Sequence, residues 1–266
     1  MKLAGLLLAL AAVCGGQTHT GLTYAKVGDR ELKLDLYLPS GNGPHPLLVW
    51  VHGGAWRAGD RAQTPARFLT QHGYAVASIS YRLSQVAQYP AQIDDCKAAV
   101  KWLRDHGSEY KLNTRRIAAW GSSAGGHLVA LLGVMSQVDA VIDFFGPTDF
   151  LRMNDVKGAM DHDAPHSPES QLVGGPIQQN QDKVAKASPL TYVNKGDPPF
   201  LIVHGDADPL VHFTQSQFLD KALRAAGVPV ELVILPGAGH GGPAFNAPEI
   251  RQKVVQFLDR NIRDAR

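Results

Sequence analysis

The sequence predicts an α/β fold built on a central, mostly parallel sheet, and two observations support this prediction. Short apolar runs alternate with longer segments of helical periodicity along most of the chain. Some runs, such as residues 47–51, are apolar on both faces, which is typical of strands buried inside a parallel sheet. With 266 residues, of which 44% are hydrophobic and 19% charged, the chain has enough apolar material for a sizeable core.

The expected elements follow from the same patterns. Two antiparallel strands open the fold, because Leu32, Leu34 and Leu36 alternate with polar residues after a Gly-Asp-Arg turn. In chain order, the sequence predicts strands at 22–28, 31–38, 47–51, 74–80, 117–120, 138–145, 199–203 and 230–235, and helices at 62–72, 91–106, 124–135, 212–226 and 247–263.

The pattern breaks between Pro147 and Pro198, where the chain is rich in Pro, Gly, Gln, Asn and His. A compact domain rarely holds about fifty residues without structure. We therefore expect a central sheet flanked by helices, with residues 147–198 as a small cap or lid over one face that belongs to the same domain.

The N-terminus has the pattern of a secretory signal peptide. Lys2 is followed by an apolar run over residues 3–13 and then by small residues. This run is shorter than the roughly 20 residues that span a bilayer as a helix. We expect residues 1–16 to be a signal peptide of an exported protein and residues 17–266 to form a single domain; the alternative is a buried N-terminal helix. Cys14 is a candidate lipid anchor, although Val13 is bulky for the position before such a cysteine.

Charge and metal-ligand patterns exclude several classes of partner. The formal net charge is +2 and no long run of like charges is present, so the sequence predicts no nucleic-acid partner. It contains neither a C-x-x-C motif nor a Cys/His cluster with zinc spacing, and we expect no metal and no cofactor.

Residues 121–125, GSSAG, match the pattern G-x-S-x-G between an apolar strand and a helix. This pattern is typical of a sharp turn from strand to helix that exposes a nucleophilic serine, with glycines allowing the tight backbone. Ser123 is therefore the candidate nucleophile. The alternative is a glycine-rich turn that serves only close packing.

Residues 52–56, HGGAW, follow the buried strand at 47–51. Two adjacent glycines let a loop present backbone N–H groups, which stabilise the oxyanion of a tetrahedral intermediate because they are oriented before the charge develops. Gly53 and Gly54 are candidate donors, with the N–H of Ala124 as their counterpart at a helix N-terminus. The alternative is a flexible loop that only closes the strand.

Two late loops provide an acid and a base. Asp206 and Asp208 follow the strand at 199–203, and His240 follows the strand at 230–235. A nucleophile, an acid and a histidine in this chain order, each after a strand, are typical of hydrolases in which the histidine takes the serine proton and the acid orients the histidine. His240 is the candidate base, and the residues alone leave both acids open.

The remaining histidines are expected to have no part in chemistry. His52 and His204 end strands and should shape their loops by hydrogen bonding, and His127 should pack inside a helix. Three further histidines are expected to be solvated: His162, His166 and His212. His162 and His166 are four residues apart and could bind a metal, but Pro165 between them argues against a helix there.

The motifs as a set resemble the α/β-hydrolase carboxylesterases near the bifunctional feruloyl and acetyl xylan esterases. The resemblance covers residues 22–263 and rests on HGGAW at 52–56, YRLS at 81–84, PAQIDDCKAAVKWLR at 90–104, GSSAGGHL at 121–128, FFGPTD at 144–149 and HGDADPLV at 204–211. The chain is also similar, more distantly, to hormone-sensitive-lipase-like esterases, which usually carry a third glycine where this chain has Ala55.

The resemblance implies an α/β-hydrolase fold and a catalytic set of Ser123, Asp208 and His240, with the oxyanion donors on Gly53 or Gly54 and Ala124. It favours Asp208 over Asp206 as the acid. Residues 147–195 are the least family-like part, so the substrate stays open.

We expect a serine carboxylesterase that cleaves short-chain acyl esters, with acetyl or feruloyl esters of plant polysaccharide as candidates. Trp56 could bound the substrate pocket or only pack its loop onto the core. Two alternatives are a serine peptidase of the prolyl-oligopeptidase type and a non-catalytic hydrolase-fold binding protein.

Overall fold

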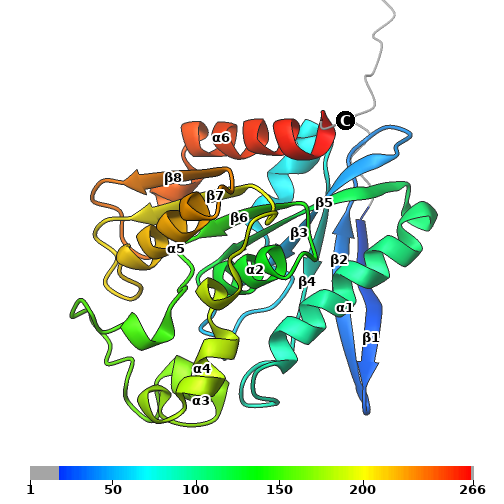
Figure 1. Cartoon of the computed structure of the whole chain (residues 1–266). Coiled ribbons are helices and arrows are strands. Elements are labelled where there is room, and N and C mark those ends of the chain that lie inside the picture. Colours follow the sequence, from blue (N-terminus) through cyan, green and yellow to red (C-terminus); the bar gives the residue numbers. More distant parts are fainter. Residues whose placement is uncertain (1–17, 265–266) are drawn as a thin grey trace, which may run out of the picture.

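The computed structural model describes residues 18–264, and the signal peptide and lipid anchor expected at residues 1–16 lie outside this part. One eight-stranded sheet runs through the molecule in the order β1-β2-β4-β3-β5-β6-β7-β8 (Figure 1). β1 pairs antiparallel with β2, and β2 pairs antiparallel with β4. The other six strands are parallel to one another: β4, β3, β5, β6, β7 and β8. The predicted α/β fold with a mostly parallel sheet is confirmed.

The strands are β1 (Thr18–Val27), β2 (Arg30–Tyr37), β3 (His45–Val51), β4 (Ala75–Ile79), β5 (Leu112–Ser122), β6 (Ala140–Phe144), β7 (Phe200–Gly205) and β8 (Val230–Leu235). The α-helices are α1 (Ala91–His106), α2 (Ala124–Val134), α3 (Pro168–Val173), α4 (Gln181–Ala187), α5 (Thr214–Ala225) and α6 (Pro248–Leu258). None of the helices within residues 18–264 is long and apolar enough to span a membrane.

Alternating side chains of the central strands divide the core into two layers. Leu47, Val49 and Val51 of β3 pack in one cluster with α1, α2 and α5. Leu48 and Trp50 point to the opposite face and pack in a second cluster with α6 and the 3₁₀ helix Pro65–His72. Helices therefore cover both faces of the parallel part of the sheet, which explains why its strands are apolar on both sides.

Several predicted elements differ from the structure in type or in bounds; β1, for example, begins at Thr18 and not at residue 22. The segment predicted as a helix at 62–72 is a 3₁₀ helix that starts only at Pro65, where proline occupies the first turn. β5 extends the predicted 117–120 strand to Leu112–Ser122, because its first residues pair with His45 and Pro46 at the start of β3. The helix predicted at 247–263 ends as an α-helix at Leu258 and continues as a short π-helical turn.

Residues 147–198 contain two short α-helices, α3 and α4, and several 3₁₀ turns. They form the lobe at the lower left of Figure 1, beside the ends of the strands. Several apolar side chains of this segment are buried in the main core cluster: Phe150, Leu172, Val173, Ile177 and Val184. The segment is therefore packed onto the sheet and helices, and it supplies part of the cavity described below.

Candidate active site

Ser123 lies on a sharp turn between β5, which ends at Ser122, and α2, which begins at Ala124. Its backbone has φ 55° and ψ −122°, a conformation that is unfavourable for a residue with a side chain and that often marks a functional position. A Cβ at Gly121 would lie 2.2 Å from the carbonyl oxygen of Gly125, and one at Gly125 would lie 2.1 Å from that of Val51. Both glycines are therefore required for the turn.

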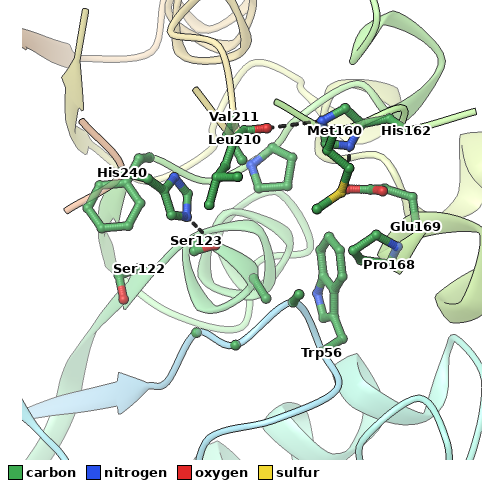
Figure 2. A pocket seen from close by; sticks show the side chains of 16 residues that line it. Trp56, Ser122, Ser123, Met160, His162, Pro168, Glu169, Leu210, Val211 and His240 are labelled. Atoms are coloured by element: carbon green, nitrogen blue, oxygen red, sulfur yellow. Dashed lines mark hydrogen bonds and ion pairs between the residues drawn. The ribbon is translucent and has the colours of Figure 1, made fainter. Parts of the chain in front are cut away.

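Two loops bring His240 and Asp208 to this turn. The Nε2 atom of His240 lies 2.9 Å from Ser123 Oγ (Figure 2). Its Nδ1 atom lies 2.6 Å from Asp208 Oδ2. The three residues follow β5, β7 and β8, whose carboxyl ends meet at one edge of the parallel sheet. The structure thus brings together the serine, the histidine and the acid that the sequence singled out.

The Asp208 carboxylate contacts several hydrogen-bond donors besides His240. Its Oδ1 accepts hydrogen bonds from the backbone N–H groups of Leu210 and Val211, and Nε2 of His204 lies 3.2 Å from its Oδ2. Burial by itself raises the pKa of this carboxyl, but the hydrogen bonds from His204 and His240 outweigh that effect and hold the pKa well below its usual value. Asp208 is therefore an anion throughout the neutral pH range.

Asp206, the other acid of the loop, has a different position. Its side chain is exposed, and its Oδ1 accepts a hydrogen bond of 2.6 Å from the N–H of Gly237. It ties the loop after β7 to the loop that carries His240. Of the two acids, Asp208 is the one that contacts the histidine.

The HGGAW loop passes close to the serine turn. A Cβ at Gly53 would lie 2.7 Å from the carbonyl oxygen of Ser122 and 3.4 Å from Ser123 Cβ, so only glycine fits there without displacement. Neither Gly53 nor Gly54 donates its N–H to another backbone group within residues 18–264. The N–H of Ala124 is at the first residue of α2, where a helix provides no acceptor. Among the described residues, these three N–H groups therefore have no backbone acceptor.

Trp56 both packs the loop and lines the cavity. Its side chain is only 2% exposed, and its Nε1–H donates to Nδ1 of His127 at 3.2 Å. His127 in turn contacts the carbonyl oxygen of Ala187 through Nε2, and burial lowers its pKa to about 4. His127 is therefore neutral, donates to Ala187 and accepts from Trp56, which ties the loop to the 147–198 segment.

A cavity of about 430 Å³ opens over Ser123. Most of its walls are apolar, and the residues that form them come from five separate parts of the chain: Trp56, Phe145, Pro147, Met160, Pro168, Leu210 and Val211. The Phe145 ring contacts His240 edge to face at 4.8 Å between centroids and limits the positions that the imidazole can adopt.

Two polar residues of the 147–198 segment, His162 and Glu169, complete the wall (Figure 2). The prediction that His162 is solvated is wrong: it is 4% exposed, because the segment folds back on itself and places the imidazole between Glu169 and Leu210. The cavity also contains three residues that were not predicted from the sequence: Glu169, Met160 and Phe145. Only the FFGPTD motif pointed to Phe145, and no local pattern marks the other two.

His52, His204 and His166 lie as expected, whereas His212, predicted to be solvated, is half-buried, and its Nδ1 lies 3.1 Å from Thr214 Oγ1. His52 contacts the carbonyl oxygen of Gly53 through Nδ1, His204 contacts Val211 and Ser216, and His166 is exposed. Within residues 18–264, no group of three or more His, Cys, Asp or Glu side chains is arranged to hold a metal ion.

The strand order and the Ser–His–Asp chain at the carboxyl ends of the strands define an α/β-hydrolase fold. The BD-FAE family model matches residues 34–223, and the chain belongs to this family.

Similar proteins carry esterase names. The esterase LipC of Mycobacterium tuberculosis is 32% identical over 217 residues, which cover 74% of this chain and 53% of LipC. The chain thus spans about half the length of the curated relatives it matches.

Solved structures match over nearly the whole chain. A truncated carbohydrate esterase from gut microbiota has a TM-score of 0.85 at 30% identity and covers 93% of this chain and 97% of its own. The esterase Est2 of Thermogutta terrifontis has a TM-score of 0.74 at 27% identity, with 93% of both chains covered, and has also been solved with butyrate and with propionate bound.

Proposed function

We propose that this protein is a serine carboxylic-ester hydrolase that acts through an acyl-enzyme, with Ser123 as the nucleophile. The observation that carries the proposal is the hydrogen-bonded chain from Ser123 Oγ through His240 to Asp208 at the base of a 430 Å³ cavity. Membership of the BD-FAE family and the esterase names of its relatives support it.

In the acylation step, Nε2 of His240 takes the Ser123 proton while Oγ attacks the ester carbonyl carbon. The negative charge that develops on the carbonyl oxygen is stabilised by the N–H groups of Ala124 and of Gly53 or Gly54. The imidazolium, stabilised by the anionic Asp208, then returns the proton to the leaving alcohol oxygen as the C–O bond breaks. Water repeats the sequence on the acyl-enzyme and releases the acid.

The proposed substrates are esters of short acyl chains such as acetyl esters linked to carbohydrate; feruloyl esters, with a larger aromatic acyl group, are a second candidate. Trp56 supports the short-chain assignment, because its ring stands in the wall next to the proposed oxyanion donors and is fixed by His127. The carbohydrate esterase and the butyrate and propionate complexes of Est2 are consistent with it. We also propose export of the protein, on the leader pattern at residues 1–16, with lipid attachment at Cys14 as a variant of that proposal.

We expect kcat/KM on p-nitrophenyl esters to be highest for acyl chains of two to four carbons. Each added methylene that the rigid Trp56 wall cannot accommodate changes discrimination by about 1–3 kcal/mol, so the decline should be graded. The measurement is kcat/KM for acetate to palmitate at a single pH. A maximum at eight carbons or more, or activation at a lipid–water interface, would contradict the short-acyl assignment.

A further inference from the structure

The cavity wall that faces Ser123 contains a buried acid–base pair with no part in the mechanism above. Nδ1 of His162 lies 3.1 Å from Oε1 of Glu169, and its Nε2 lies 3.0 Å from the carbonyl oxygen of Leu210. His162 is 4% exposed and Glu169 is 3% exposed. Both residues line the same cavity as Ser123 and His240. Figure 2 shows the pair on the side of the cavity away from His240.

The contacts of His162 define its protonation state. Nε2 must carry a proton to donate to the Leu210 carbonyl, and Nδ1 faces a carboxylate oxygen. Burial lowers the pKa of His162, but the interactions with Glu169 and with Leu210 outweigh it, so the pKa lies above its ordinary value. With Nε2 protonated, the 3.1 Å contact between Nδ1 and Oε1 holds one shared proton, so the pair as a whole carries no net charge.

Glu169 keeps one unused acceptor. Its Oε2 atom is buried and accepts no hydrogen bond from any residue of the described chain. A buried carboxylate oxygen without a donor is costly, and such an atom in a native protein requires an explanation. Since the residue lines the cavity, a ligand held over Ser123 can supply the missing donor.

The surroundings select the kind of donor. The neighbouring wall residues Trp56, Pro168 and Leu210 are apolar, and the indole N–H of Trp56 is already given to His127. Because the His162–Glu169 pair is neutral overall, it favours an uncharged donor over a cation. A hydroxyl group on an otherwise weakly polar ligand meets both conditions.

We propose that Glu169, oriented by His162, is a specificity-determining residue that accepts a hydrogen bond from a hydroxyl group of the ester substrate, away from the bond that is cleaved. This inference rests on the proposed function. Met160 lines the same wall, and its thioether lies across Glu169 in the view of Figure 2. Its unbranched side chain can rotate to admit the hydroxyl to Oε2.

The hydroxyl can belong to the acyl group or to the alcohol, and two matched substrate pairs distinguish these sources. The acyl pair is ethyl 3-hydroxybutanoate against ethyl butanoate, and the alcohol pair is glycerol 1-monoacetate against propyl acetate. For each pair, the readout is the ratio of kcat/KM for the hydroxylated ester to that for its partner. A general loss of activity cancels from this ratio.

We expect a ratio well above one in one of the two pairs and its fall by roughly 10- to 100-fold in Glu169→Gln, the usual range for a hydrogen bond to a charged group. The amide keeps the shape of the side chain but places a donor where Oε2 accepted. Glu249→Gln makes the same chemical change at an exposed position of α6 and should leave the ratio unaltered. Glu169→Asp, which withdraws the carboxylate but keeps its charge, replaces the glutamine variant if that fails to fold.

A ratio near one for both pairs in the wild-type protein, or a ratio that the Glu169 substitutions leave unchanged, would overturn the inference. Failure of the proposed function is distinguishable, because the wild-type protein would then not hydrolyse p-nitrophenyl acetate at all.

Discussion

Replacing Ser123 by alanine should lower kcat on p-nitrophenyl acetate by at least about 10³-fold, because the substitution removes the proposed nucleophilic oxygen. The fold should survive. The Ser123 side chain makes no capping hydrogen bond to α2, so alanine removes no support from that helix. The measurement combines steady-state kinetics with a thermal unfolding curve, in which the Tm should change little.

Ser122→Ala is the matched control for this variant. Ser122 is the neighbouring hydroxyl of the same turn, but its side chain points away from His240 in Figure 2. We expect it to keep most of the wild-type activity. Near-normal turnover by Ser123→Ala, or a comparable loss in Ser122→Ala, would remove Ser123 from the role of nucleophile.

Replacing Asp208 by asparagine should lower kcat by about 10⁴-fold. The amide has nearly the same size, but its NH₂ group cannot accept the Nδ1–H of His240 and favours the tautomer that cannot take the serine proton. The loss should appear in kcat more than in KM, because Asp208 is 5% exposed and lies behind His240 instead of lining the cavity.

Asp206→Asn provides the comparison, since it makes the same chemical change two residues away. The asparagine keeps an oxygen that can accept the Gly237 N–H, so we expect activity to fall by less than about tenfold. Greater damage from Asp206→Asn than from Asp208→Asn would show that the acid is misassigned.

Much of the fold could be predicted because its signals are local. Strands that are apolar on both faces, such as β3, indicate burial between two helical layers, and α1 has the predicted bounds. The first and last residues of the elements were harder to predict from the sequence. The 3₁₀ geometry after Thr64 and the early start of β5 depend on contacts with neighbouring elements, which no short window of sequence contains.

The proposed catalytic residues could be singled out because each lies on a loop directly after a parallel strand, where topology alone brings loops together. The His162–Glu169 pair could not be found this way. Those two residues come into contact only when the 147–198 segment folds over the cavity. The prediction that His162 is solvated did not take this folding into account. The contact of His204 with Asp208 was not predicted for the same reason. It requires the loop after β7 to turn back toward the end of that strand.

The most direct test of the central claim is covalent labelling with a fluorophosphonate, followed by intact-mass measurement and peptide mapping. Ser123 Oγ, activated by His240 at 2.9 Å, should displace fluoride and gain one phosphonyl group per chain. We expect a single adduct on the peptide that contains Ser123, lost in Ser123→Ala and retained in Ser122→Ala. An adduct on a different residue, or no adduct on a protein that still hydrolyses esters, would contradict the assignment.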